Sequence, residues 1–268
     1  MNGVRSLGML GVVVGLIAGT SLATAGPIYT FNWNDGDSFH NGDAGTINWV
    51  TSSFDTNNNQ FSWYVNMGEV PGSPGSYANG FTLATSDGEN PVGKSGELAL
   101  LHFDASAGTP VLTAYGYNGR NDITSHIDGT SDSSTTDTPD RIISSLESNS
   151  SDWLIETIYD VLGDGTVTMG FKIDATPITG HSPLYPEAPS WYGIGYGVEA
   201  GVWFHSFAGL QSTYQDDYLS DWESTEHGFL DTKNWPTDVT NPVPEPASLV
   251  LVGIGLGLAG ITRRRRRV

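Results

Sequence analysis

The chain has 268 residues, no cysteine, and 30 acidic side chains against 11 basic ones. The lack of cysteine excludes disulfide bonds, thiolate metal sites and cysteine nucleophiles. Between residues 26 and 244 there are five basic and 29 acidic residues, a net charge of −24, so this part of the chain repels nucleic acid and anionic membrane surfaces, and we expect no nucleic-acid partner.

The first 25 residues have the three parts of a secretory signal peptide. Arg5 supplies the initial positive charge, and residues 7–22 form an apolar helical stretch without an acid. Ala23 and Ala25 follow with the small-x-small spacing that signal peptidase accepts. The sequence therefore predicts export and cleavage at this site. A permanent N-terminal anchor is the alternative, but β-like sequence begins already at Tyr29.

The body, residues 26–240, is rich in Gly, Asn, Asp, Ser and Thr, with aromatic and β-branched residues in short runs. This composition is typical of short strands separated by turns. We expect a hairpin around Gly163-Asp164-Gly165, because Asp-Gly tolerates the positive φ of tight turns. The expected strands are residues 61–67, 80–85, 97–103, 111–117 and the two hairpin strands between 153 and 173, with further apolar runs at 191–198 and 201–207.

Helix signals in the body are scarce. Residues 140–146 could form one short helix capped by Thr138, with Pro139 at its start, and residues 124–140 read as a polar loop. Regularly spaced strands over about 210 residues predict an all-β fold, a β-sandwich of jelly-roll or lectin-like type. The order of the apolar runs is loosely similar to concanavalin-type lectin and glucanase sandwiches, a likeness of fold alone.

The last segment, residues 243–268, has three parts in order. Pro244, Glu245 and Pro246 form a short stiff motif, residues 249–261 are a glycine-rich apolar run, and an unbroken block of five arginines ends at Arg267. As a transmembrane helix, residues 247–262 would span about 24 Å of a ~30 Å hydrocarbon core. Arginine snorkelling and local thinning could make up the deficit. The arginines should stay cytoplasmic, which places the acidic body outside.

This tail resembles the PEP-CTERM sorting signal of Gram-negative and related bacteria. The resemblance implies recognition by an exosortase, cleavage near the Pro-Glu-Pro motif, and surface display or release, often in organisms that make exopolysaccharide. The helix would then be a transient inner-membrane anchor, and the mature protein would lie in the cell envelope, on the outer surface or outside the cell. The resemblance assigns no activity to the body, because unrelated bodies share such tails.

Motifs for catalysis are missing, and we assign no catalytic residue. The Glu-x-Asp-x-x-Glu pattern of laminarinase-like enzymes does not occur, and its nearest match, residues 221–226, has the wrong order and no strand character. The six histidines lack the spacing of a compact zinc site, and no Gly-x-Ser-x-Gly elbow is present. Glu97, Glu156 and Glu199 lie in or beside strands and are the acids that could line a cleft.

Two weaker patterns indicate ligands. Asp35, Asp37 and Asp43 offer hard oxygen donors in loops and are candidate calcium ligands, although Asp and Asn also populate turns for local reasons. Trp191, Trp203 and His205 belong to an aromatic stretch that could stack on sugar rings. The alternative is that these rings fill the core, and alternation along a strand would send some to each face.

The sequence thus predicts an exported, surface-sorted envelope or matrix protein with a non-catalytic binding or structural β-sandwich. Extracellular polysaccharide is its candidate ligand and calcium its candidate cofactor. The alternative is a secreted carbohydrate-active enzyme, either a glycoside hydrolase or a lyase.

Overall fold

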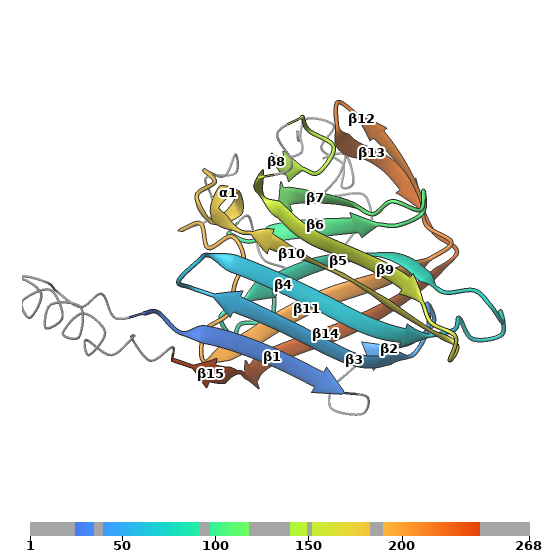
Figure 1. The fold of residues 1–268 in the computed structure, drawn as a ribbon, viewed down its shortest axis with the longest axis horizontal. Coiled ribbons are helices and arrows are strands. Elements are labelled where there is room, and N and C mark those ends of the chain that lie inside the picture. Colours follow the sequence, from blue (N-terminus) through green and yellow to red (C-terminus); the bar gives the residue numbers. More distant parts are fainter. Residues whose placement is uncertain are drawn as a thin grey trace, which may run out of the picture. The chain divides into compact units, whose positions relative to one another are not determined.

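The computed structural model describes residues 25–34, 40–91, 97–117, 140–148, 152–182 and 190–241. Residues from Gly26 to Asn241 form one compact unit, in which two antiparallel sheets pack face to face (Figure 1). The predicted all-β sandwich is confirmed. No helix within these described ranges is long and apolar enough to span a bilayer. The apolar part of the expected signal segment and the whole expected sorting tail lie outside them.

The first sheet has six strands. Side chains alternate along its inner strand β4 (Gln60–Gly68), so that Phe61, Trp63, Val65 and Met67 are buried. In spatial order the strands are β15 (Asp238–Thr240), β1 (Ile28–Asn34), β3 (Ile47–Asp55), β4 (Gln60–Gly68), β10 (Thr166–Asp174) and β9 (Leu154–Val161).

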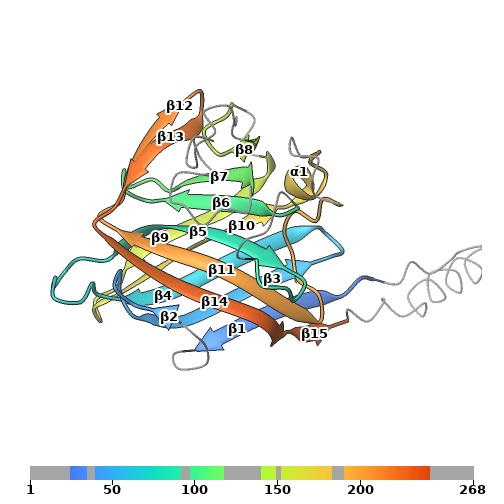
Figure 2. The same ribbon diagram turned by 180° about the vertical axis from the view of Figure 1, so that it is seen from behind.

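The second sheet has seven strands (Figure 2). Every residue of its inner strand β6 (Ala99–Asp104) is buried, as expected for a strand covered on both faces. The order is β2 (His40–Asn41), β14 (Glu226–Pro236), β11 (Glu199–Ala208), β5 (Ala78–Ser86), β6 (Ala99–Asp104), β7 (Val111–Gly116) and β8 (Arg141–Ser144).

Aromatic rings join the two sheets across the core. Trp63 of β4 lies 5.4 Å from Phe204 of β11, measured between ring centroids. Phe81 stacks on Phe103 at 4.8 Å and contacts Phe171 of the opposite sheet at 6.2 Å. Since aromatic side chains bury the largest apolar area, this cluster is the main source of cohesion between the sheets.

A third, two-stranded sheet consists of β12 (Gln211–Gln215) and β13 (Tyr218–Glu223). Its two turn residues, Asp216 and Asp217, both have positive φ, 53° and 66°, the geometry of the tight turn that matches strand twist. The expectation that residues 221–226 lack strand character is therefore wrong, because they span the end of β13 and the start of β14.

Two other expectations fail. Residues 141–144 form the edge strand β8 and not a helix, because Ile143 pairs with Ala114 of β7 and β-branched residues suit a sheet edge. Residues 191–198 contain only an isolated bridge at Gly193, and Gly193 and Gly195 have positive φ, 78° and 150°. The described residues also contain a short helix that the sequence did not predict, α1 (Thr176–Thr179).

Candidate functional site

The outer face of the seven-stranded sheet, which points away from the core between the sheets, carries a set of aromatic and titratable residues. Along β11, Phe204 points into the core, while Trp203 belongs to a separate cluster on the other face. This confirms that alternation sends the rings of this stretch to both faces. In the register with β14, Trp203 is opposite Asp231 and His205 is opposite Phe229.

Trp203 and His205 lie together in this face. Their ring centroids are 4.2 Å apart, and Trp203 stacks on Tyr117 at 5.5 Å. Only 4 % of Trp203 is exposed, so its ring packs against protein and is not an open platform. Burial and, as the smaller effect, the nearby His227 lower the pKa of His205 to about 4. The imidazole is therefore neutral at pH 7.

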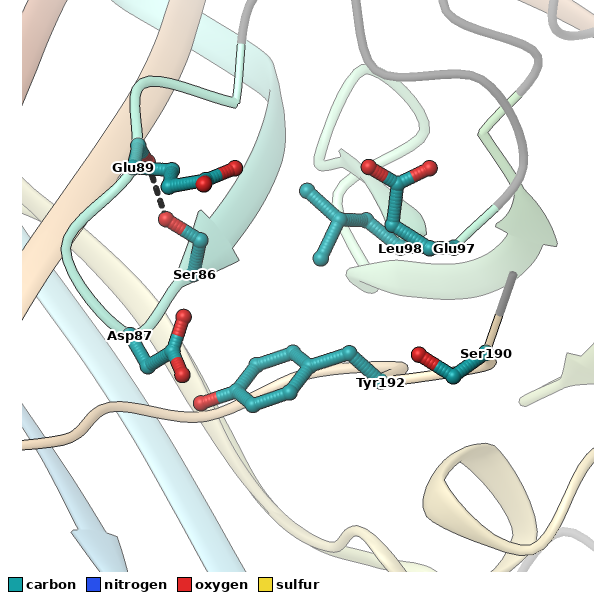
Figure 3. Close-up of a pocket in the computed structure, with 7 residues that line it drawn as sticks. All are labelled: Ser86, Asp87, Glu89, Glu97, Leu98, Ser190 and Tyr192. Atoms are coloured by element: carbon teal, nitrogen blue, oxygen red, sulfur yellow. Dashed lines mark hydrogen bonds between the residues drawn. The ribbon is translucent and has the colours of Figure 1, made fainter. Parts of the chain in front are cut away.

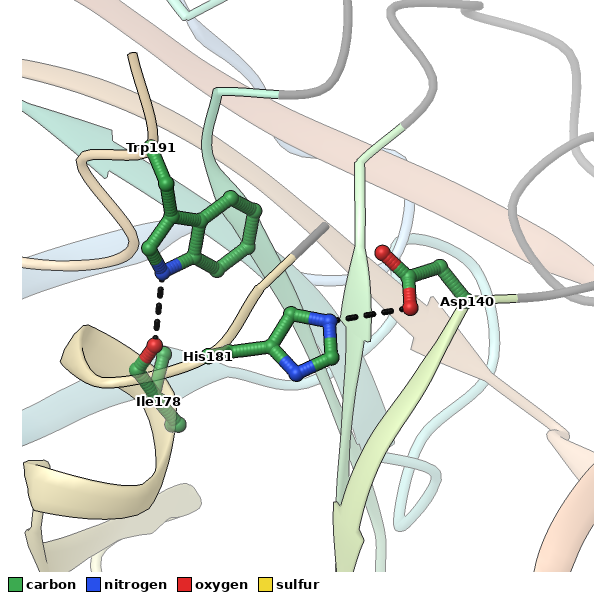
Figure 4. A network of polar contacts seen from close by, with 4 residues as sticks. All are labelled: Asp140, Ile178, His181 and Trp191. Atoms are coloured by element: carbon green, nitrogen blue, oxygen red, sulfur yellow. Dashed lines mark hydrogen bonds and ion pairs between the residues drawn. The ribbon is translucent and has the colours of Figure 1, made fainter. Parts of the chain in front are cut away.

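Trp191 does not join this pair. It lies beside α1, where its indole nitrogen donates a hydrogen bond of 2.8 Å to the carbonyl of Ile178, and its ring meets His181 edge-on at 5.3 Å (Figure 4). His181 Nε2 is 2.9 Å from Oδ1 of the buried Asp140. These contacts tie the segment after α1 to the start of β8.

Asp231 is a residue that sequence reasoning missed. Its Oδ1 is buried without a hydrogen-bond partner, and burial raises its pKa to about 6. Below about pH 6 this carboxyl group keeps its proton and can donate a hydrogen bond or a proton. Only its position on β14 opposite Trp203 reveals this environment, and β14 was not predicted as a strand.

A cavity of about 280 Å³ opens at the end of β5, next to the Trp203 cluster (Figure 3). It is close to the smallest volumes of typical ligand pockets, ~300 Å³. Leu98 and Tyr192 belong to both the cavity wall and the Trp203 cluster. The residues that line the cavity are Ser86, Asp87, Glu89, Glu97, Leu98, Ser190 and Tyr192.

Hydrogen bonds to backbone carbonyls hold the walls of this cavity in place. The amide of Tyr192 donates to the carbonyl of Glu97 at 2.7 Å, and the hydroxyl of Ser86 donates to the carbonyl of Glu89. Figure 3 shows the carboxylates of Glu89 and Glu97 on opposite sides of the space, with Asp87 and the Tyr192 hydroxyl near each other. Burial, followed by the charge of Asp87, raises the pKa of Tyr192, so the phenol stays protonated.

The chemistry of this cavity is that of hydrogen bonding to hydroxyl groups. Carboxylates accept hydrogen bonds, the phenol of Tyr192 donates or accepts, and Leu98 gives an apolar wall.

In the described ranges no group of three or more His, Asp or Glu side chains could hold a metal ion. Of the acids proposed from the sequence, Glu97 lines the cavity, Glu156 accepts a 3.4 Å hydrogen bond from Tyr64, and Glu199 lies beside Gly88.

The calcium candidates stay a prediction. Asp35 and Asp37 lie outside the described residues, whereas Asp43 belongs to the turn between β2 and β3, where the amide of Gly45 donates to the carbonyl of Gly42 at 2.8 Å. Of the expected signal-cleavage residues, Ala25 is at the first described position and Ala23 is outside.

Comparison with known proteins identifies the C-terminal segment. Residues 242–267 match the PEP-CTERM protein-sorting motif. The chain carries a PEP-CTERM sorting tail. Pro244, Glu245 and Pro246 lie within the match, as predicted, and the tail indicates exosortase recognition, export and membrane-associated sorting in a bacterium. Neither a curated protein nor a solved structure matches the chain, so the PEP-CTERM tail gives no activity for the body.

Proposed function

We propose that the body is a non-catalytic glycan-binding module of the cell envelope or extracellular matrix, and that the cavity of Asp87, Glu97 and Tyr192 binds sugar hydroxyls. The observation that carries this proposal is the composition of that cavity, with three carboxylates, hydroxyl groups and one aromatic side chain around about 280 Å³. Such walls suit a neutral, hydroxyl-rich ring better than an apolar molecule or an anion.

The charge of the body narrows the ligand further. With a net charge of −24 between residues 26 and 244, the body repels uronic-acid and sulfated polysaccharides. We therefore expect neutral glycans to bind. In this proposal signal peptidase cuts after Ala25, the C-terminal helix holds the chain transiently in the inner membrane, and the exosortase cuts near Pro244 before display or release.

Affinity electrophoresis of the purified body tests the proposal. Gels that contain a neutral polysaccharide, such as laminarin, hydroxyethylcellulose or soluble starch, should retard the protein, and gels with polygalacturonate should not. Glu97→Gln and Tyr192→Phe should weaken the retardation several-fold, because the first replaces a charged acceptor by a weaker, neutral amide and the second removes a hydroxyl group. Glu156→Gln is the matched control, because Glu156 lies on the edge strand β9 of the other sheet.

Two results would contradict the proposal. One is that no neutral polysaccharide retards the protein, and the other is that Glu97→Gln behaves like Glu156→Gln.

The placement of Glu89 and Glu97 on opposite sides of the cavity (Figure 3) also favours a second candidate, a glycoside hydrolase, which requires two carboxyl groups about 5 to 10 Å apart. Release of reducing ends from the same polysaccharides, abolished by Glu89→Gln or Glu97→Gln, would support the enzyme instead.

A further inference from the structure

The hairpin β12–β13 is an insertion at the junction of β11 and β14. Those two strands pair with each other as far as Ala208 and Glu226, so the hairpin contributes to neither of the two large sheets. Figure 2 shows it rising from the end of β11 and β14 beside β6, β7 and β8. The hairpin can therefore move without breaking a backbone ladder of the sandwich.

Side-chain contacts hold the hairpin against the outer face of the sheet. The ring of Trp222 packs 4.4 Å from Phe207 of β11. The hydroxyl of Tyr214 donates to Oδ2 of Asp104 at 2.9 Å, and that of Tyr218 donates to Glu147 at 2.5 Å. The amide of Leu219 donates to the hydroxyl of Tyr115 at 2.8 Å.

Beneath the hairpin lies a buried polar row. His102 of β6 is fully buried, with Thr82 of β5 and Thr113 of β7 as its cross-strand neighbours. The ring of Trp222 lies 6.2 Å from that of His102. Burial lowers the pKa of His102 to about 4 while Asp104 opposes the shift, so the imidazole is neutral at pH 7 and has one donor and one acceptor nitrogen.

The polar groups of this interface are not satisfied. Both ring nitrogens of His102, the hydroxyl of Thr113 and the indole nitrogen of Trp222 are buried without a hydrogen-bond partner. Native proteins leave few such atoms, because each loses its bonds to water without replacement. Four of them at one contact between a separable hairpin and a sheet indicate that these groups have partners in another state.

We propose that β12–β13 is a lid, and that the row of Thr82, His102 and Thr113 beneath it binds an uncharged, hydroxyl-rich ligand, a sugar residue of an extracellular glycan. Hydroxyl groups both donate and accept, as a neutral imidazole and threonine hydroxyls require. Phe207 and Trp222 supply rings on which a sugar can stack. Asp104 next to the row disfavours an anion, and the described residues contain no metal-binding cluster.

Thiol labelling tests the lid, because the chain contains no cysteine. Thr113 and Ala114 are adjacent on β7 and both are 0 % exposed, but Thr113 lies beneath the hairpin and Ala114 lies in the core between the sheets. A maleimide should label Thr113→Cys on the order of 100-fold faster than Ala114→Cys. Opening of the lid is enough to expose the cysteine at position 113, whereas the cysteine at position 114 becomes exposed only when the core unfolds. Adding Tyr214→Phe should accelerate only the Thr113→Cys reaction. Equal rates, or no effect of Tyr214→Phe, would overturn the lid.

Calorimetry of the whole body with cellohexaose, laminarihexaose and maltohexaose tests the ligand. We expect at least one of these hexasaccharides to bind. Tyr214→Phe should tighten that binding between about threefold and tenfold, because it weakens the closed state of the lid. The near-isosteric Thr113→Val should weaken the binding. Oligogalacturonate should not bind.

The same titrations separate this site from the cavity at Glu97. Glu97→Gln should leave the effects of Tyr214→Phe and Thr113→Val unchanged. If none of the hexasaccharides binds the Tyr214→Phe protein, or if Thr113→Val has no effect, the site beneath the lid is refuted. If a hexasaccharide binds, Thr113→Val has no effect on it and Glu97→Gln abolishes the binding, the proposed function stands and the lid site does not.

Discussion

At the scale of single residues, burial decides the chemistry of the outer face of the seven-stranded sheet. It lowers the pKa of both His102 and His205 to about 4, so neither is a cation at neutral pH, and it raises the pKa of Asp231 to about 6. All three shifts favour the uncharged form of the group. The two neutral imidazoles suit a neutral glycan and give an anionic ligand no positive histidine to pair with.

Asp231 should make stability depend on pH. Because its pKa is raised on folding, the folded chain binds this proton more tightly than the unfolded chain does, and stability should fall as pH rises from about 4 to about 6. Asp231→Asn should remove that loss. A shift of about two units corresponds to at most about 3 kcal/mol, and we expect about 1 kcal/mol because Asp231 is partly exposed. Urea denaturation at pH 4 and pH 7.5 should show the variant more stable at pH 7.5 only, and an equal difference at both values would contradict the assignment.

At the scale of elements, the sequence predicted strands whose burial is strong and regular. β4, β5, β6, β7 and the β9–β10 hairpin lie where their apolar runs and turn residues placed them. β14 was missed because, between its polar residues, Leu230 is its only buried hydrophobic residue. The cavity could not be predicted either, since its lining comes from the end of β5 and the residues after it, from the two residues before β6, and from residues 190–192. Trp203 and His205 were predicted as a pair of candidate ligand-binding residues because they belong to the same short stretch of sequence.

The pairing of β4 with β10 depends on a residue without a side chain. A Cβ at Gly170 would collide with the carbonyl oxygen of Trp63 and the backbone of Tyr64. Because two backbones cannot yield as a flexible side chain can, Gly170→Ala should cost more than about 2 kcal/mol, despite the usual gain from replacing glycine. Gly163→Ala is the matched control, because nothing lies within 4 Å of its added Cβ. Thermal denaturation followed by circular dichroism compares the two, and similar midpoints would refute the close contact.

At the scale of the whole molecule, charge separates the chain into parts with different tasks. Six of the 11 basic residues lie outside residues 26–244, and 29 of the 30 acidic residues lie inside. The match at residues 242–267 shows that the cationic end belongs to a sorting device. In the proposed function the acidic body is the part that acts after export, while the arginines serve before or during sorting. The tail was predictable because its three parts are contiguous in sequence, whereas the body's sites exist only after folding.

This division predicts how the chain is processed in its native host. Mass spectrometry of the mature protein should find Gly26 at the N-terminus and no residue beyond about Pro246, because the proposed processing removes one segment by signal peptidase and the other by the exosortase. Replacing Arg263 to Arg267 with glutamine removes the charge that, in the proposed sorting, holds the C-terminus in the cytoplasm. The variant should accumulate with its tail intact, while cleavage after Ala25 proceeds as an internal control for export. Normal trimming of the arginine-free tail would mean that sorting does not depend on the cationic block, and an intact tail in the wild-type protein would make it a lasting anchor.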